Sequence, residues 1–179
     1  SGAGLSTFSS SALVIENAGA IDVQEGVFRF DRPSTHTDAT FTTASGATLQ
    51  FNAGGVTFVG TLSGAQAGTI LLNDAVFAGA GAEWAFSGTG IEWTAEYLRA
   101  GTLTNSGLIR LTGGTGSRGV FNLGAVLRNE GTVEHADAGV FYIYADGRVE
   151  NAAAWNVTDA GDYLGSSGTG TFVNEASGT

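Results

Sequence analysis

Apolar and polar residues alternate in short runs along most of this chain. In "LRNEGTVE" (127–134), Leu127 and Val133 are apolar whereas Arg128 and Glu134 are charged, and an Asn-x-Gly bend separates the two halves. Alternation with a period of two puts one set of side chains on a buried face and the other set in solvent. Each half of the phrase therefore predicts a short β-strand. Asn and Gly suit the bend because both tolerate left-handed backbone angles.

The same phrase recurs along the chain at a regular step, which is typical of a repeat protein. Its copies are marked by Asn residues that stand two positions before a small residue, namely Asn17, Asn105, Asn129, Asn151 and Asn174. In the sequence numbering the last four follow one another at intervals of 24, 22 and 23, and the interval of 88 between the first two equals four steps of 22. We therefore expect repeats throughout, with diverged middle copies, and one ladder in which the Asn amides stack and hydrogen-bond.

A third apolar run follows the bend in most copies, as in "VFRF" (27–30), "VFNL" (120–123) and "VFYIY" (140–144). A unit of this length is too short to bury its own apolar face, whereas stacked units bury it together. The pattern predicts an all-β parallel β-helix of about eight coils, with residues 1–179 as a single domain. The alternative is an antiparallel β-sandwich, which has short strands but does not require one polarity pattern to recur at a fixed step.

The stretch "AEWAFSGTGIEWTAEYLRAG" (82–101) departs most from the phrase. Ile91, Trp93 and Tyr97 alternate with polar or small residues, which favours a strand. Ile91 and Leu98 would instead share one face of a helix, so a small helical excursion from the coil is the alternative. Because this stretch interrupts the repeat, we expect a ligand surface, if the chain has one, to lie here.

Acidic and aromatic residues in this stretch suggest a carbohydrate site. Carboxylates beside aromatic rings are typical of polysaccharide-cleaving sites, where the acids move protons and the rings stack on sugars. A second aromatic set follows in "VFYIY", where the tyrosines alternate with apolar residues and are expected to face outward. The candidate surface comprises Glu83, Trp84, Glu92, Trp93, Glu96, Tyr97, Tyr142 and Tyr144. The alternative is that the rings belong to the core and the acids between them are solvated.

The composition excludes several functional classes. The net charge is −10 and charged residues make up only 13% of the chain, so we expect no nucleic-acid partner, because an acidic surface repels phosphates. No apolar run approaches the length of a membrane span, and we expect no membrane insertion by this segment. Cys is absent, which excludes disulfides and thiolate chemistry.

Several phrases are similar to the Gly/Thr/Asn-rich β-strand repeats of large bacterial surface proteins. They are "IENAGAIDV", "GATLQFNAGG", "GTLTNSGLIRL", "VLRNEGTVE" and "TFVNEASGT". The group includes filamentous-haemagglutinin-like adhesins and the passenger regions of autotransporters. The resemblance implies a right-handed parallel β-helix on a secreted or surface-anchored protein, where it serves as a stalk or adhesive. The chain would then be a segment of a longer repetitive polypeptide.

These observations lead to one functional hypothesis and one alternative. We expect a non-enzymatic structural or adhesive solenoid, located outside the cell or at its surface, that acts as a stalk, an adhesin segment or a fibre subunit. Its partners would be neighbouring repeats, further copies stacked head to tail, or surface glycans and host proteins. The alternative is a β-helix that binds or cleaves glycans.

Catalytic and cofactor signatures are missing from the sequence. His36 and His135 are the only histidines, too few for a multi-His zinc site, and no Gly-x-Ser-x-Gly nucleophile elbow occurs. We expect no cofactor, with calcium as the one candidate, since Asp137, Asp159 and Asp162 offer isolated oxygens. The Gly-rich "GGTGSRG" (113–119) resembles a calcium-binding repeat but has Arg where that repeat needs Asp.

Overall fold

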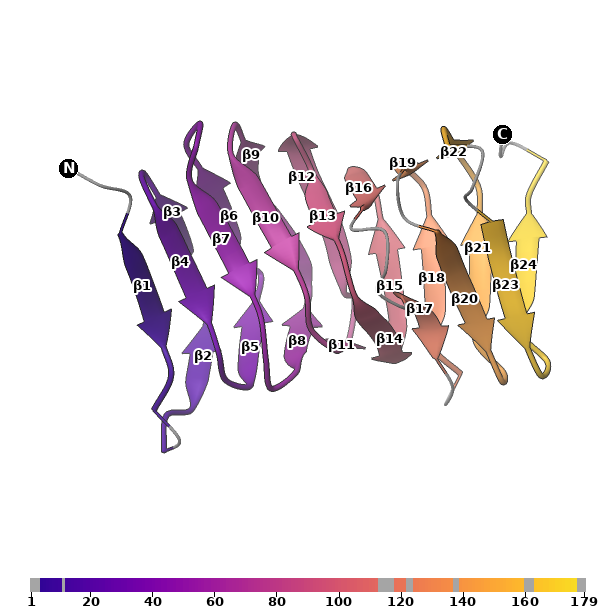
Figure 1. Cartoon of the computed structure of the whole chain (residues 1–179). Helices are drawn as coiled ribbons and strands as arrows, with labels where there is room; N and C mark the ends of the chain where they lie inside the picture. Colours follow the sequence, from indigo (N-terminus) through magenta and orange to yellow (C-terminus); the bar gives the residue numbers. More distant parts are fainter. Residues whose placement is uncertain are drawn as a thin grey trace.

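The chain winds into a three-sided coil, and every regular element in the part that the structure describes is a β-strand. The structure is a computed structural model that describes residues 4–10, 12–112, 118–121, 124–136, 139–159 and 163–176. Within these ranges no helix is long and apolar enough to span a membrane. In Figure 1 the chain runs down the near side and up the far side while it advances from the N- to the C-terminal end, which makes the coil right-handed.

Three parallel sheets, each with eight strands, form the sides of the coil, and the chain visits them in the order A, B, C. Sheet A contains β1 (Leu5–Phe8), β4 (Val27–Phe30), β7 (Thr48–Phe51), β10 (Thr69–Leu72), β13 (Ile91–Trp93), β16 (Leu108–Leu111), β19 (Thr132–His135) and β22 (Ala154–Val157). Sheet B contains β2 (Ile15–Asn17), β5 (Ser34–Thr37), β8 (Val56–Val59), β11 (Val76–Ala78), β14 (Glu96–Ala100), β17 (Arg118–Phe121), β20 (Val140–Tyr144) and β23 (Tyr163–Ser167). Sheet C contains β3 (Ala20–Val23), β6 (Thr40–Thr43), β9 (Thr61–Gln66), β12 (Glu83–Gly88), β15 (Thr102–Asn105), β18 (Val126–Asn129), β21 (Arg148–Asn151) and β24 (Thr171–Asn174).

The predicted parallel β-helix is confirmed, and the sandwich alternative is wrong. About seven full turns separate the first and last strands of each sheet, slightly fewer than the eight coils expected. The stretch 82–101 forms strands and no helix, which confirms the strand prediction there. The step between paired strands is not constant, because Ile91 pairs with Ile109, a step of 18, whereas Leu108 pairs with Thr132, a step of 24.

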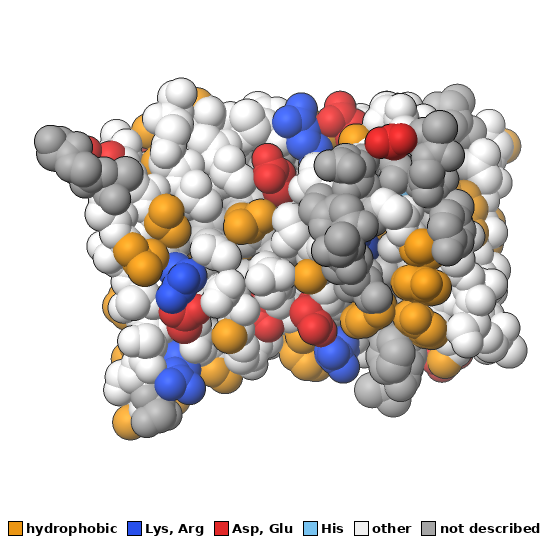
Figure 2. Space-filling model, viewed as in Figure 1, with side chains coloured by type: hydrophobic (Ala, Val, Ile, Leu, Met, Phe, Trp, Pro, Cys, Tyr) orange, Lys and Arg blue, Asp and Glu red, His pale blue; other side chains and the backbone are white. Residues whose placement is uncertain are grey.

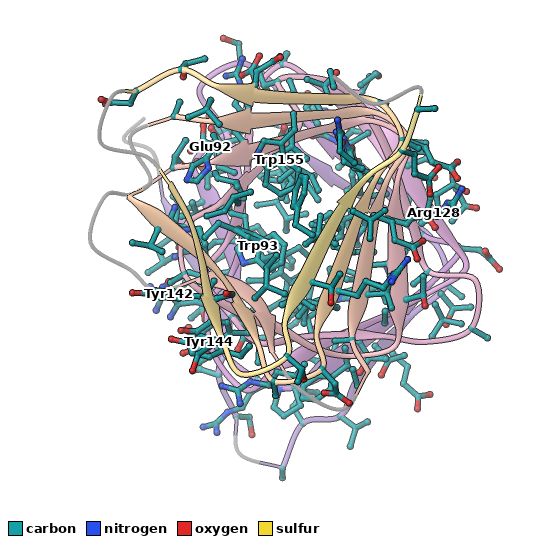
Figure 3. All side chains as sticks on the ribbon, turned by 90° about the vertical axis from the view of Figure 1, so that its right-hand side faces the viewer. Glu92, Trp93, Arg128, Tyr142, Tyr144 and Trp155 are labelled. Carbon is teal, nitrogen blue, oxygen red and sulfur yellow. The ribbon has the colours of Figure 1, made fainter. Side chains whose placement is uncertain are left out.

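Apolar side chains from all three sheets fill the interior as one continuous core. Nine rings form an aromatic spine through it, in which the centroids of successive rings lie 5.3–6.0 Å apart. The spine consists of Phe8, Phe30, Phe51, Phe58, Trp84, Trp93, Phe141, Trp155 and Phe172. Figure 3 looks along the coil and shows Trp93 and Trp155 inside the ring of strands. The spine therefore spans the molecule from its first strand to its last.

The corner between sheets C and A carries the Asn ladder. Asn105 donates through Nδ2 to Oδ1 of Asn129 at 2.8 Å, Asn129 donates likewise to Asn151 at 2.7 Å, and Asn151 to Asn174 at 2.7 Å. The ladder also provides hydrogen-bond partners for backbone groups of the bends, since Asn129 Oδ1 accepts the Gly131 N–H at 3.3 Å. Asn105, Asn129 and Asn151 are fully buried, so these paired amides avoid the cost of unsatisfied polar groups.

Asn17 does not belong to this ladder, which corrects the sequence-based assignment. It ends β2 in sheet B, lies in register with His36, and its Nδ2 is 3.4 Å from His36 Nδ1. The phrase around Asn17 therefore turns from sheet B to sheet C, whereas the phrase around Asn105 turns from sheet C to sheet A. The 88 residues from Asn17 to Asn105 cover four turns and one further side of the coil, because several turns are shorter than 22 residues, such as the steps of 19 from Ile15 to Ser34 and of 20 from Val56 to Val76.

A second polar ladder, at the corner between sheets A and B, escaped the sequence interpretation. Asn52 donates through Nδ2 to Asp31 at 2.8 Å, and Asn73 donates to Asn52 at 3.4 Å. Desolvation alone would raise the pKa of Asp31, but hydrogen bonds from Asn52, Thr7 and Arg29 outweigh it and hold this pKa below its usual value. The ladder residues recur at steps of 21, a regularity that the search for the Asn-x-Gly phrase did not capture.

Candidate functional site

The two tryptophans of the predicted carbohydrate surface lie in the core. Trp84 is 1% exposed and Trp93 is 0% exposed, and both are members of the aromatic spine. Trp93 is further fixed by a hydrogen bond of 3.0 Å from its Nε1 to the Ala95 carbonyl. Glu83 and Glu92, the residues before these tryptophans, face outward. Because successive side chains of a strand point to opposite faces, each tryptophan ring faces inward. Neither ring can stack on an external sugar, and their assignment to a ligand surface is corrected.

The three acidic residues of that predicted surface lie on three different sheets. Glu83 points outward from sheet C, and Glu92 lies on the outer face of sheet A (Figure 3). Glu96 begins β14 in sheet B with a left-handed backbone (φ 67°), and it pairs with Arg99 at 2.9 Å. The expected grouping of acids around the tryptophans is therefore not assembled.

The tyrosines, in contrast, come together on the outer face of sheet B. The ring centroids of Tyr142 and Tyr144 lie 5.1 Å apart with near-parallel planes, and Tyr97 meets Tyr144 edge-on at 5.6 Å. Figure 3 shows Tyr142 and Tyr144 side by side on the outside of the coil. Partial desolvation raises the pKa of the Tyr144 hydroxyl, with further contributions from a hydrogen bond with Tyr97 and from the charges of Tyr97 and Tyr142. These three rings, the tyrosine cluster, form a half-buried aromatic patch.

A polar groove of about 550 Å³ crosses the outer face of sheet C. Small residues make it hollow, because the run "AGAGA" (78–82) and Gly101 form the corner where the groove begins. Thr102 and Thr104 of β15 form its floor between taller side chains of the adjacent strands β12 and β18. The groove thus borders both ends of the stretch 82–101, although Glu83 is the only member of the predicted surface that lines it.

Glu83 forms one wall of the groove. It lies in register with Thr61 on one side and Thr104 on the other. Its carboxylate accepts hydrogen bonds from the hydroxyls of Thr61 at 3.2 Å and Ser106 at 2.5 Å. These bonds hold the acid in place while leaving lone pairs available on both oxygens, because an ionised carboxylate has about four acceptor sites.

Arg128 and Glu130 form the opposite wall. The guanidinium lies 2.6 Å from Glu130 and 3.1 Å from Glu150, and 3.8 Å from Glu175. Hydrogen bonding to Glu130 and the charges of Glu130 and Glu175 raise the pKa of Arg128. Arg128 lies on the outer side of the coil (Figure 3). Each such exposed ion pair contributes little to the free energy of folding. Their effect is to fix the guanidinium over the groove.

Sequence reasoning missed one buried cation in the interior. Arg118 is 0% exposed, and its Nη1 donates to the carbonyls of Trp93, at 3.3 Å, and of Thr112. It begins β17 in register with Phe141, an inward-facing residue. The carbonyls that it binds belong to the chain at the corner between sheets A and B, so Arg118 holds this corner together.

Both histidines are buried, and both pack and hydrogen-bond inside the coil. His135 Nε2 lies 3.1 Å from the Gly139 carbonyl, which accounts for a polar residue at an otherwise apolar position. His36 packs among phenylalanine rings, and its Nε2 lies 3.0 Å from the Ser34 hydroxyl. Burial lowers the pKa of His36 to about 4, so it is neutral near pH 7.

The calcium hypothesis gains no support from the described residues. Asp137, Asp162 and residues 113–117 lie outside them, and Asp159 is the one predicted carboxylate within them. Across the described ranges, no three His, Asp or Glu side chains gather in a way that could hold a metal ion.

The space-filling view in Figure 2 shows small groups of charged side chains separated by uncharged surface. Both signs occur on this face, so the net charge of −10 is dispersed rather than gathered there into one acidic patch.

Comparison with family models, with curated proteins and with solved structures finds no match to this chain.

Proposed function

We propose that this chain is a non-enzymatic structural segment that extends by stacking coil on coil at its ends. The observation that carries the proposal is the aromatic spine, whose terminal rings are only partly covered. Phe8 in β1 is 39% exposed, whereas Phe30 in the next coil is 1% exposed. The difference arises because Phe8 lacks a described coil on its outer side. A further coil placed there would bury the ring and continue the spine.

The opposite end offers a matching apolar surface. Val157 is 52% exposed and Leu164 is 38% exposed, at the ends of sheets A and B. Trp155 packs against Phe172 of the last strand of sheet C, with centroids 5.4 Å apart. Both ends thus present apolar side chains together with strand edges that no described strand covers, and such edges pair readily with another strand.

The coil that stacks on either end would be a neighbouring repeat of the same polypeptide or a second copy of this chain. Such an arrangement serves as a stalk, as a segment of a surface adhesin or as a fibre subunit. We place the protein outside the cell or at the cell surface, which rests on the resemblance of its repeats to those of bacterial adhesins.

The backbone of β1 provides a selective test of end-to-end stacking. The carbonyls of Gly4 and Phe8 accept hydrogen bonds from the next coil, at 2.9 Å from Val27 N in β4 and 3.1 Å from Asp31 N just after β4. The Gly4 carbonyl and the Leu5 N–H belong to the same peptide unit and point to opposite sides of the strand. Because this carbonyl faces β4, the N–H of Leu5 faces the outer edge of the sheet. Leu5→Pro removes this N–H and blocks strand addition while leaving the bonds to β4 intact.

We expect the wild-type chain to increase in mass with concentration in sedimentation-velocity experiments, and Leu5→Pro to associate at least about tenfold more weakly. Leu5→Val is the matched control, because it keeps the N–H, and should associate like the wild type. Circular dichroism verifies that both variants are folded. A wild-type chain that stays monomeric at its highest soluble concentration would refute self-stacking, as would equal association of the Pro and Val variants.

A further inference from the structure

We propose that the groove on sheet C is a binding site for an uncharged oligosaccharide. This inference is independent of end-to-end stacking, because the groove lies on the side of the coil between β12 and β18 and stays open when the ends are covered. It also uses different residues from the acidic and aromatic surface predicted from sequence, apart from Glu83.

The lining of the groove matches a ligand that donates and accepts hydrogen bonds at close intervals. Glu83 and Glu130 offer acceptors on opposite walls, and Arg128 offers donors. The hydroxyls of Thr102 and Thr104 can do both from the floor. Sugar hydroxyls also donate and accept, so one ring can satisfy several of these groups together.

The charge of the groove argues against an anionic ligand. Its two carboxylates outnumber its one guanidinium, and Arg128 is already engaged by Glu130 and Glu150. An acidic sugar, a phosphate or a nucleic acid would therefore meet net repulsion. An uncharged sugar avoids this cost.

The structure of the groove also argues against a peptide. Its floor is the face of a sheet whose strands β12, β15 and β18 are paired with one another, so a peptide strand finds no free edge to extend. The small and hydroxyl-bearing residues of the lining provide no apolar pocket for an anchoring side chain, which peptide recognition normally requires. The volume of about 550 Å³ lies within the range of small-molecule sites.

The test is to fill the groove without altering the coil. Thr102 is exposed on the floor of the groove, and Thr171 is exposed in the same column of sheet C, three coils further along. Thr102→Phe places a ring in the groove, whereas Thr171→Phe places the same ring on the same face away from it. Binding is first measured on an array that holds uncharged, sialylated and sulfated oligosaccharides, and then by calorimetry with the best ligand.

We expect the wild-type chain to bind one or more uncharged oligosaccharides. Thr102→Phe and Glu83→Gln should each weaken binding by about tenfold or more, while Thr171→Phe binds like the wild type. Circular dichroism and the mass in solution should be unchanged in all three variants. The proposal is overturned if no uncharged glycan binds, if only sialylated or sulfated glycans bind, or if Thr102→Phe and Thr171→Phe have equal effects.

Discussion

Polar residues inside this coil are tolerated where hydrogen bonds satisfy them, either across to the neighbouring coil or within their own coil. The Asn ladder is the clearest case, since one amide donates to the next and also serves the bend beside it. His36 is a different case, in which an ionisable ring is surrounded by Phe30, Phe41 and Phe51 at centroid distances of 5.1–5.3 Å. Such a ring can be buried only in its neutral form, since a buried charge without a partner is costly.

The burial of His36 predicts a loss of stability in mild acid. Its pKa falls from 6.5 to about 4 on folding, so the unfolded chain takes up a proton between these values while the folded chain does not. The free energy of unfolding should therefore decrease as the pH drops from about 6.5 to 4, by up to about 3 kcal/mol from this residue, and His36 should contribute no further loss below that window. His36→Phe, which matches Phe58 beside it in register, should remove this slope.

Urea unfolding at several pH values between 8 and 4 measures this effect, with the wild type and His36→Phe compared at each pH. The carboxylates titrate in both proteins, so the difference between the two curves isolates the histidine. Parallel curves across this range would rule out His36 as the acid-sensitive group.

At the scale of the element, the close approach of successive coils limits the size of the side chains that the corners can hold. A Cβ on Gly131 would lie 2.3 Å from the Gly107 carbonyl oxygen of the adjacent coil, and one on Gly107 would lie 2.2 Å from the Phe86 carbonyl oxygen. Neither glycine has a left-handed backbone. The sequence interpretation ascribed the small residue to bend angles, whereas the structure shows that contact between coils requires it.

If contact between coils sets the requirement, two glycines at the same place in the phrase should differ in how much their replacement by Ala lowers the free energy of unfolding. Gly131→Ala should lower the free energy of unfolding by roughly 1–3 kcal/mol, because the methyl group overlaps backbone that cannot move without disturbing the next coil. Gly19→Ala should change it by less than about 0.5 kcal/mol, because the nearest atom to its Cβ, Asn17 Oδ1, is 3.8 Å away. Thermal or urea unfolding of the two variants distinguishes contact from bend geometry, since a bend requirement would make their costs equal.

At the scale of the whole molecule, each coil contacts only the coils beside it, so stability is distributed along one dimension. The terminal coils have one described neighbour, and β1 is exposed at all four of its residues. Fraying should therefore begin at the ends and rarely reach the centre.

Hydrogen exchange provides the measurement. We expect slow exchange in the central strands β9 to β16 and fast exchange in β1 and β24 when the protein is dilute. If coils stack end to end, raising the concentration should slow exchange at β1 and β24 while leaving the centre unchanged. Uniform exchange along the chain would contradict the one-dimensional account.

Strand formation, parallel stacking and the existence of a polar ladder could all be predicted from the sequence. Alternation fixes which side chains share a face, and recurrence of the phrase at steps of 22 to 24 residues predicts that its copies lie in register on successive coils. Leu127 and Val133 are fully buried as expected, whereas Arg128 and Glu134 remain partly exposed. These features depend on local geometry and on the length of one turn, both of which the sequence records.

Only the tertiary structure decided which corner each phrase occupies and which of the three sheets carries each acidic residue. Turns differ in length, from 18 to 24 residues between paired strands, so a spacing close to a multiple of 22 does not show whether Asn17 and Asn129 occupy the same corner. Alternation places Glu83 and Trp84 on opposite faces of one strand, but the sheet to which the strand belongs depends on how many residues each preceding corner uses. The groove likewise arises from residues of three coils, 78–83, 101–104 and 128–130, which become neighbours only when the coils stack.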